Sequence, residues 1–394
     1  MERILQVKKV TFVINTDGNG MPDKQAVLYR GETVKPPVLP TRAKLTFEGW
    51  YADAGFKQPW DFSVIPAGSV SLFAKWVPKD GGGEGGPDPI GEPGSEDNPF
   101  QIGDSDDAAD ILQNIGGDDG QYPLDAYYEL TGNIELDTTK SNNWEPIGDV
   151  DKPFTGSFNG NGFYIKGMRI QVTNENDDRS MFGSAGIKSG TGQPAEVKNF
   201  GLIDARITNN GGNNNGLTGT VVAVNAGRLE NVYIVGSNSS VLGSNIVGGM
   251  VGRNEARGTI RNCFVSIAGI MSGAGGGGIA GGIAGDNSGT IENCFVLTKT
   301  IDVGTGIQGF IAGQSTGTLK GNYAYGSLSS NAASNNGASL ALDTQAKQQS
   351  FWENAGFVLS DNGGMWWWHG STGMPTLGQD QTQGDKELQP WPTW

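Results

Sequence analysis

A repeat with a period of about 30 residues is the strongest constraint in this sequence. It is visible in five segments: AEVKNFGLID (195–204), GRLENVYIVG (227–236), GTIRNCFVSI (258–267), GTIENCFVLT (289–298) and GTLKGNYAYG (317–326). Their matching apolar residues, the anchors, are 32, 31, 31 and 28 positions apart: Val197, Leu229, Ile260, Ile291 and Leu319. A near-constant spacing of this size predicts a solenoid, in which each repeat forms one coil and packs against the coils beside it.

The residue content of the repeats favours strands over helices. Glycine accounts for 64 of the 394 residues, and it destabilises the interior of a helix by about 1 kcal/mol relative to alanine. Short apolar runs alternate with Gly and Asn turns, and a second run precedes three of the repeats: GMVG (249–252), GIAG (282–285) and FIAG (310–313). We therefore expect an all-β chain whose repeats form a parallel β-helix with two or three short strands per coil.

Stacked coils place equivalent residues in columns along a solenoid. Two residues after the anchor, four repeats carry asparagine: Asn199, Asn231, Asn262 and Asn293. Asparagine tolerates turn geometry, and its side-chain amide can bond the amide of the next coil. We expect these residues to form an asparagine ladder.

The residue between the anchor and the asparagine alternates in charge. This column reads Lys198, Glu230, Arg261, Glu292 and Lys320. Because neighbouring strands lie about 4.8 Å apart, opposite charges in adjacent coils attract, and a slip by one coil would bring like charges together. We expect the column to fix the register of the stack, which is a structural role.

The cysteine and histidine content limits the chemistry available. Cys263 and Cys294 fall on adjacent coils, where buried free thiols are the favoured interpretation and a disulfide is the alternative. His369 is the one histidine of the chain. Two cysteines and one histidine cannot supply a four-ligand zinc site, so we expect no metal and no cofactor.

Composition divides the chain into four parts. Residues 1–79 alternate as strands do, in VTFVI (10–14), QAVLY (25–29), LTFEGWY (45–51) and SLFAKW (71–76). Residues 80–98 are rich in Gly, Pro and acid and are expected to form a flexible linker. The repeats belong to a third part, residues 99–377, and residues 378–394 form a C-terminal tail.

Charge and hydropathy limit the kinds of binding partner and the cellular locations that this chain could have. Residues 1–80 carry 11 Lys and Arg against 8 Asp and Glu, whereas the remainder carries 16 against 34. Such an acidic body repels phosphate backbones, which argues against a nucleic-acid partner. No run approaches the roughly 18 apolar residues of a membrane span, and the N-terminal segment lacks a signal-peptide core. We expect a secreted or cell-surface protein whose export signal lies outside this sequence, a cytoplasmic protein being the alternative.

The first part resembles the Listeria–Bacteroides repeat, a small β-grasp-like module of bacterial surface proteins. The matching pieces are GETVKPPVLPTR (31–42), FEGWYAD (47–53), WDF (60–62) and LFAKW (72–76). Lys44 and Leu45 stand where that family usually has Gly-Tyr, which affects one local turn.

The repeat region resembles the GLUG motif of right-handed parallel β-helices in secreted and surface bacterial proteins. Outside the repeats, the similar segments include WEPIG (144–148), PFTGSFNGNGFYIKGMRI (153–170), FWENAGF (351–357) and WWWHGSTGMPTL (366–377). A solenoid needs sealed ends. We expect a cap helix over DAADILQNI (107–115) at one end and the Trp-rich segment as the cap at the other.

Two segments are candidate binding sites. Trp366, Trp367 and Trp368 offer a stacking platform for sugar rings, although a lid over the core is the simpler interpretation. Glu175, Asp177 and Asp178 occupy a loop that leaves an expected strand, where carboxylates could gather in a cleft. A plain loop tip is the alternative for these acids.

The two resemblances imply a non-catalytic, adhesin-like surface protein, associated with the outer membrane of a gut Bacteroides-type bacterium. Its implied partner is a glycan or a protein of the host or cell surface. Two alternatives stay open. The first is a carbohydrate-active lyase or hydrolase that uses carboxylates on the solenoid face. The second is a purely architectural stalk.

Overall fold

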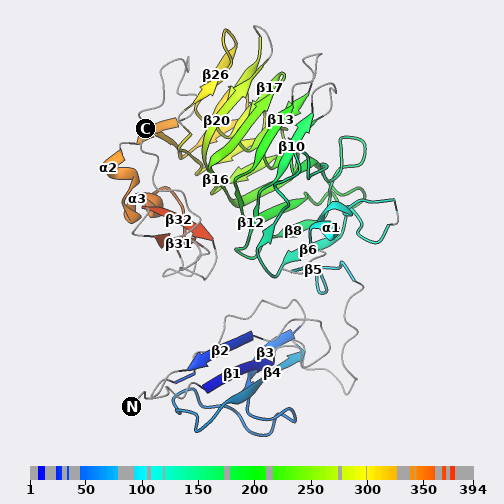
Figure 1. The fold of residues 1–394 in the computed structure, drawn as a ribbon, viewed down its shortest axis with the longest axis vertical. Helices are drawn as coiled ribbons and strands as arrows, with labels where there is room; N and C mark the ends of the chain where they lie inside the picture. Colours follow the sequence, from blue (N-terminus) through cyan, green and yellow to red (C-terminus); the bar gives the residue numbers. More distant parts are fainter. Residues whose placement is uncertain are drawn as a thin grey trace. The chain divides into compact units, whose positions relative to one another are not determined.

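The structure is a computed structural model, and it confirms the all-β fold class with 52% strand and 5% helix. It describes residues 8–13, 24–28, 33–34, 45–78, 93–103, 108–118, 120–172, 178–209, 216–273, 277–298, 300–325, 338–341, 343–359, 366–369 and 373–377. Most of the expected linker and the whole C-terminal tail lie outside these ranges. The chain divides into two compact units, Met1–Pro99 and Phe100–Trp394 (Figure 1).

The first unit is a four-stranded mixed sheet. Its strands are β1 (Lys8–Val13), β2 (Lys24–Leu28), β3 (Leu45–Tyr51) and β4 (Val70–Pro78). Their order is β2-β1-β4-β3, with β1 parallel to β4 and the outer pairs antiparallel. One face buries a small core that includes Phe12, Trp50 and Leu72, in which the Phe12 and Trp50 rings meet edge to face. This core is the reason for the strand alternation in the sequence.

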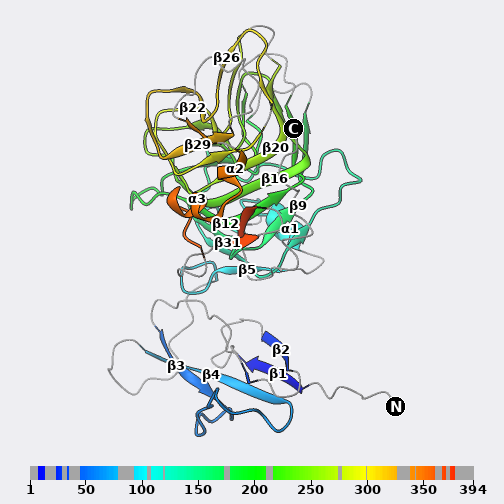
Figure 2. The same ribbon diagram turned by 90° about the vertical axis from the view of Figure 1, so that its left-hand side faces the viewer.

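The second unit is a parallel β-solenoid of about 7 turns. Its largest sheet contains 17 strands: β5 (Phe100–Ile102), β6 (Tyr127–Leu130), β7 (Ile134–Glu135), β8 (Ser157–Asn159), β9 (Tyr164–Lys166), β10 (Arg169–Val172), β12 (Glu196–Ile203), β13 (Arg206–Asn209), β16 (Arg228–Gly243), β19 (Thr259–Arg261), β20 (Phe264–Ser272), β23 (Thr290–Glu292), β24 (Phe295–Val296), β25 (Ile301–Asp302), β28 (Thr318–Lys320), β29 (Asn322–Tyr325) and β30 (Ala338–Ala341). In Figure 2, the labelled strands of successive coils follow one another along this unit.

Two smaller parallel sheets complete the coils. One contains β11 (Phe182–Ala185), β15 (Val222–Asn225), β18 (Val251–Asn254), β22 (Ala284–Asn287) and β27 (Ala312–Ser315). The other contains β14 (Leu217–Thr218), β17 (Ile246–Gly248), β21 (Ile279–Gly281) and β26 (Ile307–Gly309). Each of these strands pairs with its counterpart in the next coil, so the sequence period becomes a spatial period.

The repeat anchors are register partners. Strand pairing places Val197 beside Leu229, Leu229 beside Ile260, Ile260 beside Ile291 and Ile291 beside Leu319. The first four are buried, with exposed fractions of 1% or less. A column of branched apolar side chains thus fills one edge of the core.

Close backbone approach explains part of the glycine content. Gly248 and Gly281 are register partners just before the strands of the five-stranded sheet. A Cβ added at Gly248 would lie 1.8 Å from the Val251 carbonyl oxygen, and one at Gly281 would lie 1.9 Å from that of Ala284. No other residue type fits where the chain turns back so tightly.

A short helix lies near the first coil, within the range expected for an N-terminal cap. Helix α1 (Ala108–Gln113) buries Ala108 and Leu112, and Ile115 follows in the same core. These residues join the cluster that contains Ile102 of β5.

The C-terminal segment corrects the expectation of an end cap. It comprises α2 (Asp343–Ala346), α3 (Gln349–Asn354), β31 (Trp366–His369) and β32 (Met374–Leu377). This segment lies along the side of the solenoid, against an outward-facing aromatic column of four register partners: Tyr233, Phe264, Phe295 and Tyr323 (Figure 1).

Ring contacts reach every member of that aromatic column. The Trp352 ring centroid lies 5.4 Å from that of Phe264 and 4.8 Å from that of Phe295. The Trp366 ring lies 6.3 Å from that of Tyr233, and Phe351 contacts Tyr323 at 5.0 Å. An exposed aromatic column would be a large apolar patch, and covering it across four coils stabilises the stack.

Candidate functional site

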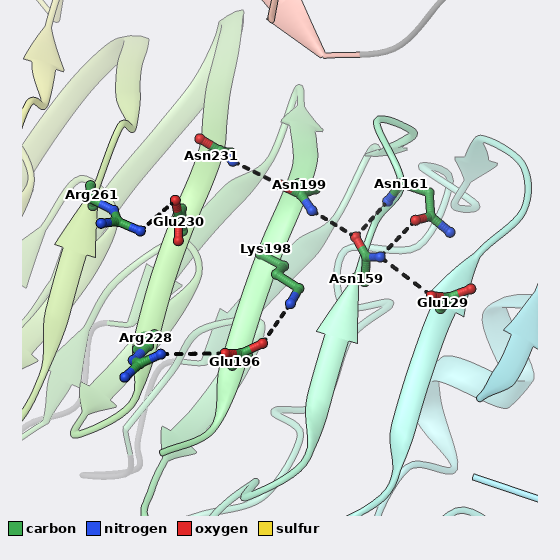
Figure 3. Close-up of polar contacts among 10 residues, drawn as sticks. All are labelled: Glu129, Asn159, Asn161, Glu196, Lys198, Asn199, Arg228, Glu230, Asn231 and Arg261. Atoms are coloured by element: carbon green, nitrogen blue, oxygen red, sulfur yellow. Dashed lines mark hydrogen bonds and ion pairs between the residues drawn. The ribbon is translucent and has the colours of Figure 1, made fainter. Parts of the chain in front are cut away.

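The outer surface of the 17-stranded sheet carries two adjacent columns of polar side chains. We call these 13 residues the polar face: Gln101, Glu129, Asn159, Lys198, Glu230, Arg261, Glu292 and Lys320 in one column, and Glu196, Arg228, Thr259, Thr290 and Thr318 in the other. All are exposed or half-exposed, and their backbone positions are set by strand pairing. Figure 3 shows part of this face.

Ion pairs cross between coils at two steps of the alternating charge column. Arg261 Nη2 lies 2.8 Å from Glu230 Oε1, and Lys320 Nζ lies 2.7 Å from Glu292 Oε1 (Figure 3 shows the first pair). The hydrogen bond from Arg261 to Glu230 raises the pKa of the guanidinium above its ordinary value. These partly exposed pairs are each worth about 0.2–1 kcal/mol.

Lys198 departs from the expected pattern. Its Nζ lies 2.5 Å from Oε2 of Glu196, two residues earlier on the same strand and face, although Glu230 is its register partner. Arg228 approaches the other oxygen of Glu196 at 3.7 Å. A carboxylate on the same strand therefore competes for the lysine, and the column consists of separate pairs in place of one continuous chain.

The four asparagines lie in a single file beside the polar face. All have left-handed backbone geometry, with φ of 62° at Asn199, 53° at Asn231 and 54° at Asn262 and Asn293. Asn231 Nδ2 donates to Asn199 at 2.9 Å, and Asn293 Nδ2 donates to Asn262 at 3.3 Å. Asn199 extends the file to Asn159 at 2.9 Å (Figure 3).

The file is interrupted in its middle. Asn231 Oδ1 accepts a hydrogen bond from Trp366 Nε1 at 3.3 Å, and no amide bond between Asn231 and Asn262 is found in the described part of the chain. The C-terminal segment thus takes an acceptor of the ladder. Residues with positive φ turn the chain at this corner, a position for which Asn and Gly are suited.

A second, fully buried ladder was missed by the sequence analysis. Asn225 Nδ2 donates to Asn254 Oδ1 at 2.8 Å, Asn254 Nδ2 donates to Asn287 Oδ1 at 2.8 Å, and Asn287 Nδ2 donates to Ser315 Oγ at 2.9 Å. The three asparagines are 1% exposed or less. Buried amides need hydrogen-bond partners, and here the side chain of each coil supplies the partner for the amide of the coil beside it.

The two cysteines are buried free thiols in this structure. Cys263 Sγ lies 3.1 Å from the Arg261 carbonyl oxygen, and Cys294 Sγ lies 3.3 Å from that of Glu292. Burial raises the pKa of the Cys263 thiol, and the neighbouring Cys294 adds to the effect. A neutral thiol is a poor nucleophile, which fits a packing role.

The tryptophans do not form one platform. Trp366 is 1% exposed and packs on Phe357 and Phe264, so its ring is not available to stack on a sugar. Trp367 and Trp368 are half-buried on β31. Alternate side chains of a strand point to opposite faces, which separates Trp367 from its two neighbours.

The acidic loop is only partly described. Glu175 and Asp177 lie outside the described residues, and so does the side chain of His369. Asp178 Oδ1 accepts a hydrogen bond from the Leu217 backbone N–H at 2.8 Å, an interaction that joins two coils. This carboxylate therefore has a structural partner.

The described ranges lack two features that would point to a metal or a membrane. They contain no group of three or more His, Cys, Asp and Glu side chains placed to hold a metal ion. None of the helices they contain has the length and apolar character needed to cross a membrane.

Comparison with known proteins gives a domain match in the first unit and two partial matches to longer proteins. Residues 9–75 match the Listeria-Bacteroides repeat domain. Halomucin of Haloquadratum walsbyi is 31% identical over 166 residues, which are 42% of this chain and 2% of that protein. A protein of Evansella cellulosilytica, named as a Gly-rich membrane protein, is 29% identical over 199 residues, which are 43% of this chain and 22% of its own length. The chain thus spans a small part of these relatives, and no solved structure matches it.

Proposed function

We propose that this chain is a non-catalytic secreted or cell-surface protein whose solenoid binds a glycan or a protein of the host or cell surface through the polar face. The observation that carries the proposal is the arrangement of 13 exposed or half-exposed polar side chains in two straight columns on paired strands. A surface held by strand pairing is already ordered before a ligand arrives. Binding therefore costs less conformational entropy than it would on a mobile loop.

The comparisons support a surface location. The N-terminal domain belongs to a repeat family that occurs in bacterial surface proteins, and one relative is named a membrane protein. We assign the repeats to the GLUG type and the coil to the right-handed form. The right hand follows from the strong preference of parallel strand connections for that hand.

The polar face suits a hydrated ligand. It combines three threonine hydroxyls in register, Thr259, Thr290 and Thr318, with flanking charges of both signs. Neither sign dominates, so the face does not depend on one strongly charged partner. Hydroxyl and carboxylate groups are the usual hydrogen-bonding partners of sugars and of extended peptides.

An architectural stalk is the second candidate, and the buried ladder favours it. Asn225, Asn254, Asn287 and the covered aromatic column all stabilise the stack and contribute nothing to the surface. The carbohydrate-active enzyme remains the third candidate, although Asp178, the one described acid of the expected loop site, is bound to backbone.

A blocking substitution separates these possibilities. The full chain would be screened on an array of glycans and matrix proteins, and each hit would be re-measured with Thr290→Tyr. Thr290 lies in the middle of the polar face and points outward. The matched control is Gln314→Tyr, on an outward position of the five-stranded sheet.

The proposal expects a reproducible hit that Thr290→Tyr weakens by about tenfold or more while Gln314→Tyr retains it. An array without any hit would favour the stalk. Release of reducing sugar from a polysaccharide by the purified chain would establish the enzyme and overturn the non-catalytic assignment.

A further inference from the structure

Two arginines face each other across neighbouring coils on another part of the 17-stranded sheet. Arg169 of β10 is the register partner of Arg206 of β13, and these strands lie side by side (Figure 1). Neighbouring strands are about 4.8 Å apart, and like charges directly opposite destabilise a sheet. The charge column of the polar face avoids this arrangement, because its register partners have opposite sign.

The two arginines form no ion pair with a carboxylate in the part of the chain that the structure describes. Among the described residues, neither guanidinium has an acidic side chain within 4.0 Å. The neighbouring Asp204 turns its Oδ1 toward Gly236, where that oxygen is buried without a hydrogen-bond partner. Burial and the charge of Arg206 lower the pKa of Arg169, and the charge of Asp204 acts in the opposite direction.

Backbone carbonyls hold both side chains in place. Arg169 Nη1 donates to the carbonyl oxygens of Met168, at 3.1 Å, and Asp204. Arg206 Nε donates to the Asn238 carbonyl oxygen at 2.8 Å. A guanidinium has five N–H donors, so each arginine keeps donors that these bonds do not use.

Two neutral polar residues extend the same surface. Gln171 and Thr208 are register partners two residues beyond the arginines, and side chains two apart in a strand point to the same face. Gln171 is exposed and Thr208 is half-exposed. We call Arg169, Gln171, Arg206 and Thr208 the arginine patch.

We infer that the arginine patch binds the carboxylate or sulfate group of an acidic glycan. This inference rests on the proposed glycan binding, and it adds a site for the acidic groups of the glycan on the same sheet, apart from the polar face. Guanidinium groups bind such oxyanions through paired, charge-assisted hydrogen bonds, and an anion between Arg169 and Arg206 would relieve their repulsion. Gln171 and Thr208 would bond the neighbouring sugar hydroxyls. The chain has a net charge of −15, so selectivity for a polyanion must come from this local patch.

The test compares charged and neutral polysaccharides. Binding of the full chain to heparin, polygalacturonate and dextran would be measured, with free sulfate as competitor. The variants are Arg169→Gln and Arg206→Gln, and the control is Arg257→Gln, an exposed turn residue with the same change in charge. Thermal melting would check that every variant is folded.

The inference expects binding to heparin, polygalacturonate or both, competition by sulfate, and about a tenfold loss of affinity for each patch variant. The preferred polymer tells whether sulfate or carboxylate is the group recognised. The inference is overturned if the Arg206→Gln variant binds the acidic polymers as tightly as the Arg257→Gln control does. Preference for dextran also overturns it, while the proposed glycan binding stands. A chain that binds none of the three polymers and no glycan on the array would defeat both this inference and the proposed glycan binding.

Discussion

Replacing Asn254 by alanine is expected to lower the free energy of unfolding of the solenoid by about 3–5 kcal/mol, because it leaves two buried amides without a partner at about 1–3 kcal/mol each. Asn254 is fully buried and bonds Asn225 on one side and Asn287 on the other, both at 2.8 Å. Water cannot replace the lost amide at a site that is this well packed. A loss of this size corresponds to a fall in Tm of about 10 °C.

Thermal and urea unfolding of the full chain would measure this effect, with circular dichroism as the readout. Asn245→Ala is the control, since Asn245 is a half-buried turn residue of the same coil region without a side-chain hydrogen bond in the described structure. Adding Asn225→Ala to Asn254→Ala should cost less than the sum of the two single changes, because the partners share one network. Equal losses for Asn254→Ala and Asn245→Ala would refute the ladder argument.

Three further experiments test the alternating charge column, the packing of the C-terminal segment and the burial of the two thiols. Glu292→Lys should lower the free energy of unfolding by about 1–2 kcal/mol, because the new lysine would lie between its register partners Arg261 and Lys320. Glu255→Lys should change it by under about 0.5 kcal/mol in the same urea titration. Trp352→Ala should cost about 3–5 kcal/mol and expose the C-terminal segment to limited proteolysis, and an unchanged digestion pattern would count against its packing role. Cys263 and Cys294 should react with an aromatic disulfide reagent only on unfolding. Burial raises the pKa of the Cys263 thiol, so the folded state keeps this thiol neutral at a pH where the unfolded chain ionises it. The stability that the buried thiol contributes should therefore be full below about pH 8.5, the usual pKa of a free cysteine, and should be lost as pH rises above that value.

The sequence was sufficient to predict the stacking because every repeat contributes one residue to each column. The anchors, asparagines and charges recur at one offset, so register follows directly from alignment of the repeats. The buried ladder was harder to recognise. Asn225 and Asn287 stand four residues before their anchors, but Asn254 stands six before Ile260, and this two-residue insertion hides the column.

Two features depend on tertiary contacts that the repeat pattern does not specify: the direction of the aromatic column and the ion-pair partner of Lys198. Tyr233, Phe264, Phe295 and Tyr323 recur with the period, yet their outward direction becomes clear only when strand alternation is followed past the positive-φ corner. The C-terminal segment packs on this outward column, which places the segment at the side of the solenoid. The pairing of Lys198 with Glu196 in place of Glu230 likewise depends on side-chain reach, which spacing does not specify.

Successive repeats lie directly beside one another in register, and the rest of the fold depends on this stacking. Thr259 and Thr290 are register partners on the surface, and Thr318 lies one coil further. Cysteines at these positions would be labelled with pyrene in the folded chain, in which Cys263 and Cys294 are buried. Stacking in register should give strong excimer fluorescence for the Thr259→Cys/Thr290→Cys pair and much weaker excimer fluorescence for Thr259→Cys/Thr318→Cys. Equal signals from the two pairs, or none from the first, would contradict it.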